Sequence, residues 1–125
     1  MLESALTALL RHDDIASHHR GIWPNEIPSG SELPALSYKV ITDRPINTID
    51  QTGPRQATVQ VNCVASDLQS AQNLAVVVRN TLPTQRGTVA TLSIKSIVES
   101  STLPSVDSDS NTHHRMQDFT IHYSE

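Results

Sequence analysis

Aromatic residues, cysteine and glycine are all scarce in this chain of 125 residues, and each scarcity excludes something. With one Trp, two Tyr and one Phe, the core must be built from Val, Ile, Leu and Ala. The single cysteine, Cys63, excludes an internal disulfide, and its place in a predicted strand is typical of a small buried hydrophobe. None of the four glycines begins a GxGxxG or GxxxxGKS/T motif, so a phosphate-cradling loop has no support.

Long apolar runs are also missing. No stretch approaches the roughly 20 apolar residues that a membrane-spanning helix needs, so we expect no membrane partner. Residues 1–10 are apolar, but they contain Glu3 and lack both a basic start and a cleavage site, which argues against a signal peptide. We therefore expect the protein to be made and to fold in a cytoplasm.

Basic residues are too few and too scattered for a nucleic-acid-binding surface. Lys and Arg number 9 against 13 Asp and Glu, which leaves a formal net charge of −4. The length fits one domain, residues 1–125. Apolar residues make up 37% and charged residues 18% of the chain, both a little below the globular average. Such a composition indicates polar loops, or a domain that completes its burial against neighbours.

Hydrophobic periodicity predicts an α+β fold. Leucines at helical spacing predict a helix at 2–10, and a longer periodic run predicts a helix at 68–82, capped by Ser66 or Asp67 and stopped by Pro83. Alternating residues predict four strands, at 36–43, 57–65, 91–100 and 113–123. Two adjacent strand pairs with helices between them favour an antiparallel sheet of about four strands, with two helices packed on one face.

The segments between these elements differ in character. The proline-rich stretch 12–34 is typical of a loop, in which Ile22 and Trp23 form a short extended piece before Pro24. Within 91–100 the alternation slips midway, which indicates a β-bulge. The polar segments 44–55 and 103–112 are expected to be mobile loops.

Four aliphatic residues are expected to lie at a subunit or partner interface. Val76 and Val77 widen the apolar arc of the 68–82 helix beyond a minimal stripe, so the helix can contact something besides its own sheet. Ile46 and Ile49 lie exposed between the turn residues of the 44–55 loop. These four positions are the predicted site of the chain.

Histidines are the first candidates for chemistry, because the tripeptide His-His-Arg occurs at 18–20 and again at 113–115. Asp13, Asp14 and Asp118 are possible carboxylate ligands for a metal. However, adjacent residues of a strand point to opposite faces, so two neighbouring histidines do not easily ligate one ion. No HExxH or CxxC spacing is present either. We therefore expect no metal and no other cofactor.

Nucleophilic and acid–base sites have equally little support. No serine lies in a GxSxG elbow, and Ser66 stands at a strand-to-helix junction without flanking glycines, where capping the helix is its ordinary role. The Asp13-Asp14 pair follows a helix, where solvent exposure is the ordinary interpretation. No catalytic residue is expected, and the chain is predicted not to be an enzyme.

Taken in order, these elements resemble the tail completion proteins of long-tailed bacteriophages, which are similar in fold to tail terminator and head–tail joining proteins. The parts that carry the resemblance are an N-terminal helix with Leu6 and Leu9, a strand with Tyr38, the strand ATVQVNCVA at 57–65, the helix at 67–82 and the closing strand HRMQDFTI at 114–121. They span nearly the whole chain and depend on order and spacing, because each motif alone is unspecific. The length of the proline-rich segment 22–34 departs from the family pattern.

The resemblance implies a structural virion protein. Its copies, usually six, would form a ring at the head-proximal end of the tail tube, complete the tail and join it to the head connector. The implied partners are further copies of the chain, the tail tube protein and the connector or stopper protein, with DNA passing through the lumen without specific binding. The implied location is the tail or neck of the virion, after assembly in the bacterial cytoplasm.

Two other functions stay open. One is a small non-enzymatic binding or assembly-chaperone module that acts through its sheet face or the 44–55 loop. The other is a metal-dependent enzyme that uses His18, His19 or His114. The identity of the neighbouring genes would test the first, and metal analysis of the purified protein would decide the second.

Overall fold

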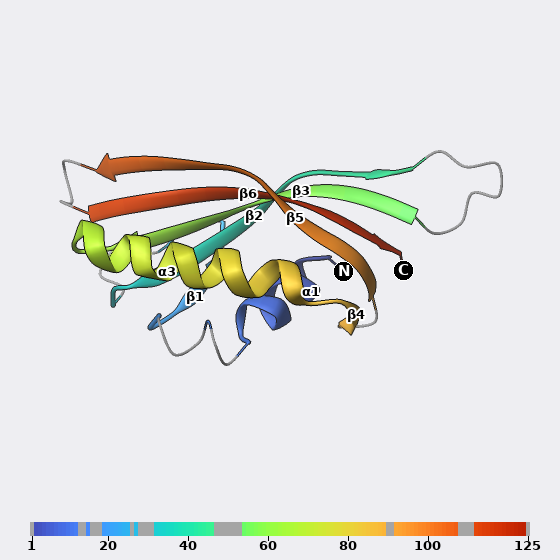
Figure 1. Ribbon diagram of the computed structural model, residues 1–125, viewed down its shortest axis with the longest axis horizontal. Coiled ribbons are helices and arrows are strands. Elements are labelled where there is room, and N and C mark those ends of the chain that lie inside the picture. Colours follow the sequence, from blue (N-terminus) through green and yellow to red (C-terminus); the bar gives the residue numbers. More distant parts are fainter. Residues whose placement is uncertain are drawn as a thin grey trace.

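The structure is a computed structural model that describes residues 2–12, 15, 19–25, 27, 32–46, 54–89, 92–107 and 112–124, with the backbone alone at 103–107. Its elements run along the chain as helices and strands of very different length (Figure 1). They are α1 (Leu2–Leu10), β1 (Ile22–Pro24), β2 (Ala35–Pro45), β3 (Pro54–Ala65), α3 (Leu68–Thr81), the 3₁₀ helix η1 (Leu82–Thr84), β4 (Gly87–Val89), β5 (Leu92–Asp107) and β6 (Thr112–Ser124).

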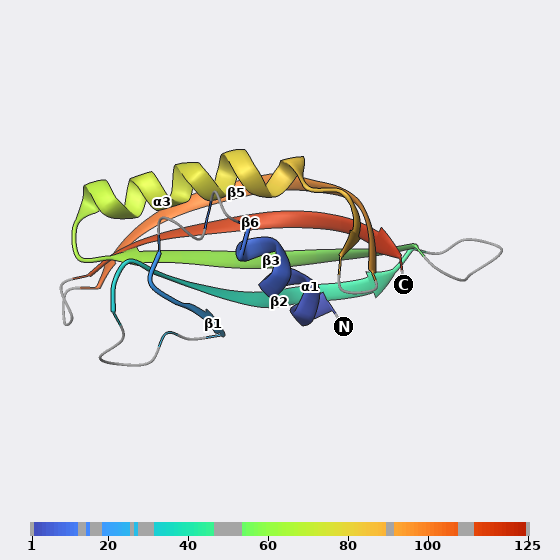
Figure 2. The same cartoon turned by 90° about the horizontal axis from the view of Figure 1, so that it is seen from below.

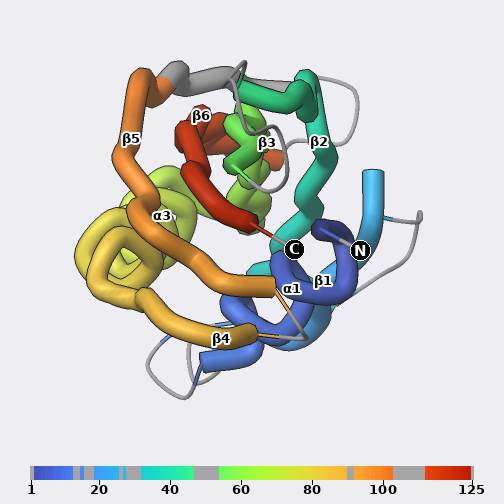
Figure 3. Tube along the Cα trace, turned by 90° about the vertical axis from the view of Figure 1, so that its right-hand side faces the viewer, coloured from blue at the N-terminus to red at the C-terminus, as the bar shows by residue number. Residues whose placement is uncertain are grey.

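The strands form one six-stranded sheet in the order β1-β2-β3-β6-β5-β4. It is mixed, because β1 pairs with β2 in parallel while every other pair is antiparallel. Seen end-on, the sheet curls, and α1 and α3 lie inside the curl (Figure 3). Both helices bury side chains in one core cluster with β2, β3, β5 and β6. The α+β class and the two helices on one face are therefore confirmed.

The predicted count of about four antiparallel strands is wrong, because two short edge strands complete a sheet of six. β1 pairs with β2 in parallel, and β4 pairs with β5 in antiparallel orientation. Each of these two edge strands has only 3 residues, which is too short to produce a periodic pattern. β1 is the extended piece predicted around Ile22 and Trp23, and Pro24 is tolerated there because β1 is an edge strand. Gly87, at φ +98, allows the turn into β4.

The long strands extend further than the sequence predicts, so the two expected loops are shorter. β2 continues to Pro45 and β3 already begins at Pro54, while β5 continues to Asp107 and β6 begins at Thr112. Arg44 and Pro45 pair with β3, and residues 103–107 pair with β6. These two ladders hold in extended conformation residues that local sequence assigns to loops. The rest of both predicted loops, 47–53 and 108–111, lies outside the described residues, so their mobility stays a prediction.

The core lies on the concave face of the sheet, where every second residue of the central strands is buried. In β3 these are the predicted Ala57, Val59, Val61, Cys63 and Ala65, all at 0% exposure. α3 covers this surface with its own buried stripe, which is also the one expected from its spacing. Figure 2 shows α3 lying along β5 and β6 while α1 sits over β2 and β3. Burial of this face is the main stabilising term of the fold.

Two bulges in β5 explain why its alternation slips. The pairing with β6 shifts between Ile94 and Ser96 and again between Glu99 and Ser101. Each shift inserts one residue, so Ile94 and Ile97 both reach the core although they are three positions apart. The predicted bulge is confirmed, and the second one, which follows Glu99, places Thr102 opposite Gln117.

His19 lies beside α1 and is expected to make the fold sensitive to acid. Burial lowers the pKa of His19 below its ordinary value of 6.5, and the nearby backbone of Leu10 and Gly21 opposes this shift only in part. Because the unfolded chain protonates this side chain first, stability is lost as the pH falls below 6.5.

A His19→Gln variant should therefore lose less thermal stability than the wild type between pH 7 and pH 5. The measurement is the melting temperature by circular dichroism at both values, with His122→Gln as the matched histidine control. An equal acid-induced drop in wild type and His19→Gln would contradict the assignment.

Candidate assembly surfaces

The four residues predicted at an interface fall in three different environments. Val76 on α3 and Ile46 at the end of the β2 hairpin arm are exposed, at 46% and 36%. Val77 is half-buried and packs against the core, so it contributes to the fold as well as to any surface. Ile49 lies outside the described residues. The structure does not bring Ile46 and Val76 together, because Ile46 follows the end of β2, which extends beyond α3, the helix that carries Val76 (Figure 1). The interface itself stays a prediction.

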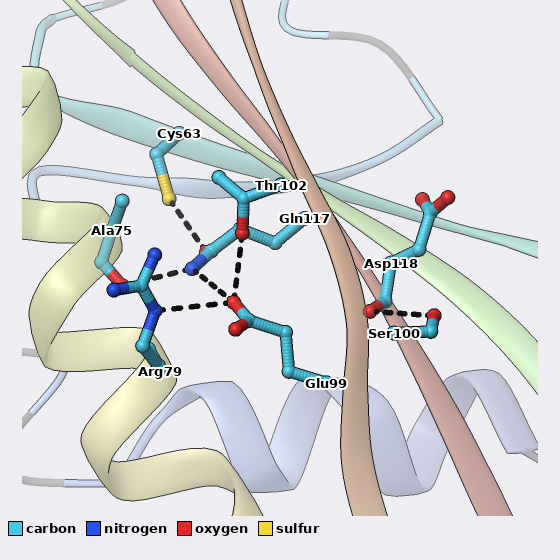
Figure 4. A network of polar contacts seen from close by, with 8 residues as sticks. All are labelled: Cys63, Ala75, Arg79, Glu99, Ser100, Thr102, Gln117 and Asp118. Atoms are coloured by element: carbon cyan, nitrogen blue, oxygen red, sulfur yellow. Dashed lines mark hydrogen bonds and ion pairs between the residues drawn. The ribbon is translucent and has the colours of Figure 1, made fainter.

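Beneath the same helix lies a buried polar network that ties α3 to three strands (Figure 4). Its centre is Gln117 of β6, at 0% exposure, whose Nε2 donates to the Ala75 carbonyl at 2.9 Å and to Glu99 Oε2 at 3.4 Å. Cys63 Sγ donates to Gln117 Oε1 at 3.7 Å, and burial raises the pKa of this thiol. Cys63 is therefore a structural residue, as predicted.

The Glu99 carboxylate accepts the remaining hydrogen bonds of this network. Its Oε2 also accepts from Arg79 Nε at 3.2 Å and from Thr102 Oγ1 at 2.8 Å. The first of these links β5 to α3, and together the bonds fix the helix against the sheet. The network was not foreseen, although Gln117 shares a strand face with Phe119 and Ile121, and that position was the available signal.

A shallow groove of about 390 Å³ opens where α3 meets β5 and β6. Its walls come from Gln69, Gln72, Val76 and Arg79 on α3, together with Thr102 and Arg115 on the strands. It therefore adjoins the network above and includes the exposed Val76. The groove combines cationic, amide and aliphatic side chains, which suits a protein partner better than a small apolar ligand.

At the far end of the sheet, Tyr123 holds the base of the β2–β3 hairpin. Its hydroxyl lies 2.7 Å from both carboxylate oxygens of Asp43, and Arg55 Nε donates to Asp43 Oδ1 at 3.1 Å. These three residues come from β6, β2 and β3. The hairpin beyond them extends past both helices (Figure 1). The cluster thus fixes the direction in which an exposed arm leaves the body.

The contacts of this cluster lead us to expect a raised pKa for the Tyr123 hydroxyl. Burial and the Asp43 carboxylate raise the pKa of Tyr123 to about 12. The chain has two tyrosines, so in a Tyr38→Phe variant the absorbance near 295 nm reports Tyr123 alone. We expect ionisation at about pH 12 before alkaline unfolding, and a lower pKa once Asp43→Asn is added, because the variant removes the carboxylate but not the burial. Ionisation near pH 10 in the Tyr38→Phe protein would refute the contact.

Several polar side chains on the convex face of the sheet bond to one another, although Asn62 Oδ1 has no partner among the described residues. Asp118 accepts from Gln60 at 3.2 Å and from Ser101 at 3.2 Å. His114 lies within hydrogen-bond distance of Asn62 at 3.2 Å, and its other ring nitrogen contacts Thr112. Figure 4 shows Asp118 on the other side of the strand from Gln117.

The candidate metal ligands are not gathered at one point. Across the described ranges, no three His, Cys, Asp or Glu side chains come together in a way that could hold an ion. Both ring nitrogens of His114 already have neighbours, whereas His19 lies beside α1 and Asp118 on the sheet. Asp13, Asp14 and His18 lie outside the described residues. Of the helices that can be described, none is long and apolar enough to cross a membrane.

Comparison with known structures supports the architecture. One chain of a solved assembly described as "Virion of native gene transfer agent (GTA) particle" aligns with a TM-score of 0.71 and 10% sequence identity. The alignment covers 100% of this chain and 95% of that chain. At this identity the likeness shows the fold alone. No curated protein matches the chain in sequence.

Sequence comparison with protein families gives a more specific result. The family model for "Tail completion protein gp17" matches residues 4–124. The match runs from residue 4 in α1 to the end of β6, so every described strand, the whole of α3 and most of α1 lie inside it. The resemblance drawn from the order of the elements is confirmed. The chain belongs to the tail completion protein gp17 family.

Proposed function

We propose that this chain forms a homo-oligomeric ring, of six copies, at the head-proximal end of a phage tail tube, and that the ring completes the tail and joins it to the head connector. The observation that carries the proposal is the family match over residues 4–124. Membership makes the chain a structural tail protein. The ring, its copy number and the joining role are the proposed part.

The fold supplies what a closed ring requires. A ring of identical copies uses heterologous contacts, so each subunit must present two different patches. One candidate is the outer face of α3, where Leu68 and Val76 are exposed at 47% and 46%. The other is the exposed end of β2, where Ile46 lies and whose direction the Tyr123 cluster fixes.

A ring at the head-proximal end of the tail tube would have further protein partners. The proposed ring contacts the tail tube protein on one side and the connector or stopper protein on the other, and it is built in the host cytoplasm before joining the virion. DNA would pass through the lumen without specific binding, since a chain of net charge −4 neutralises few phosphates. The function involves no catalytic step and no cofactor.

The test is the mass of the purified chain in solution, alone and after mixing with purified tail tubes. Native mass spectrometry and light scattering should detect a single closed oligomer, or one that appears only on the tube end. Electron microscopy of capped tubes gives the copy number. A strict monomer that never associates with tubes would exclude the proposed function.

A binding or chaperone module acting through the sheet face is less well supported. The polar side chains of the convex face bond to one another, as the pairs around Asp118 and His114 show. Polar groups that already bond one another gain little from a partner's polar groups. Release of the chain from the finished particle would nevertheless favour the chaperone over the ring.

A further inference from the structure

Among the described residues, Arg115 lines the groove beside α3 and forms no ion pair. Its Nε atom is buried and has no hydrogen-bond partner. Three other arginines form ion pairs, each with a nitrogen–oxygen distance of 3.4 Å or less. They are Arg20 with Glu32, Arg55 with Asp43, and Arg79 with Glu99. In the part of the chain that the structure describes, no carboxylate pairs with Arg115. Its position on β6, opposite Cys63 and Pro104, leaves it facing the groove.

A buried guanidinium donor without an acceptor is costly, so the missing acceptor is expected to come from outside the subunit. Arginine presents its donors as a planar fork, and a carboxylate is the group that matches this fork with two parallel bonds. The side chains beside Arg115 in the groove can contact the rest of the partner segment that carries this carboxylate. Val76 offers an exposed aliphatic surface, and the amides of Gln69 and Gln72 can bond a partner's backbone.

We propose that this groove receives an acidic side chain of a second copy of the chain, and that Arg115 binds its carboxylate. The inference rests on the proposed ring and names one of its contacts. Charge complementarity identifies the occupant, because the chain has 13 acidic against 9 basic residues and its surface therefore offers carboxylates to a copy. Glu3, exposed on α1, is one carboxylate that makes none of the described ion pairs.

The geometry is also that of a heterologous contact. The groove belongs to α3, β5 and β6, whereas Glu3 belongs to α1, which packs against β1, β2 and β4. Because Arg115 and Glu3 lie on different elements, a contact between them joins two copies, and repeating this heterologous contact forms a ring when its rotation closes. Salt should weaken the association, since the paired charges lie at a partly exposed groove.

The experiment compares self-association of the wild type with that of Arg115→Ala, using sedimentation velocity at low and high salt. We expect Arg115→Ala to weaken association by about tenfold or more, as truncating one side of a partly buried charge pair does. The monomer should keep its melting temperature or gain a little, because the variant removes a donor that the monomer leaves unpaired. Lys39→Ala, on an exposed site of β2, is the matched control for losing one positive charge.

Three results would overturn the inference. They are equal association of Arg115→Ala and wild type, equal weakening by Lys39→Ala, and a loss of association that only follows a lower melting temperature. These outcomes are separate from a failure of the proposed function. If the wild type forms no oligomer, alone or on tubes, the ring is wrong; if it forms one that ignores Arg115, only the groove contact is wrong.

Discussion

Gln117→Glu is expected to lower the free energy of unfolding by about 3 to 5 kcal/mol at neutral pH, the range for an unpaired charge in a protein interior. The new carboxylate keeps the shape of the amide but loses its donor group. It would face the Ala75 carbonyl and the Glu99 carboxylate, both of which now accept from Gln117 Nε2. At 0% exposure there is no water to compensate for this repulsion.

The pH dependence of this variant separates charge from shape. Burial beside Glu99 raises the pKa of the introduced carboxyl above the value in the unfolded chain, so the folded state binds its proton more tightly. The variant is then closest to wild type below the unfolded pKa of about 4.3, and the deficit grows as the pH rises through the folded pKa. Urea unfolding of both proteins at pH 4.5 and pH 7.5 measures the difference.

Gln117→Met is the control, since it fills similar space without a charge. It breaks the bonds to Ala75 and Glu99 and is expected to cost about 1 to 3 kcal/mol, with little change between the two pH values. If Gln117→Glu were no worse than Gln117→Met at pH 7.5, the buried network would not hold α3 in the way that its geometry indicates.

The sequence alone predicted the helices and strands whose apolar residues recur with a regular helical or strand period. α3 was predicted nearly to the residue because its apolar positions recur every three or four residues and Asp67 caps it, with Oδ1 accepting from the Ser70 amide at 2.7 Å. β3 was predicted because its buried face alternates without a break. Even the slip in β5 was visible, although one slip was expected where the structure has two.

The missing parts depend on long-range pairing that a local pattern does not contain. β1 and β4 exist only because β2 and β5 lie beside them, and 3 residues carry no period of their own. The same holds for the candidate surfaces. Val76 and Val77 were predicted together, although Val77 alone lies three residues from Leu74 and four from Thr81 on the buried stripe, and the structure packs Val77 against the core and leaves Val76 exposed.

The difference in burial between Val76 and Val77 leads to the second prediction with a large expected effect. Val76→Asp is expected to abolish ring formation while changing the free energy of unfolding by no more than about 0.5 kcal/mol, as for other exposed substitutions. Val76 is 46% exposed and lines the groove, so a carboxylate there would repel the acidic side chain that Arg115 is proposed to bind. Sedimentation velocity and chemical unfolding of the same preparation measure the two quantities.

Val77→Asp is the informative companion, because it places the same charge one residue along the helix. Val77 packs against the core, so a charge there should cost the fold about 1 to 3 kcal/mol, the range for a polar group buried without a partner. Asn80→Asp, exposed on the same helix, controls for added negative charge. A ring that survives Val76→Asp, or that Asn80→Asp disrupts equally, would move the subunit contact away from the α3 groove and leave the hairpin arm at Ile46 as the candidate.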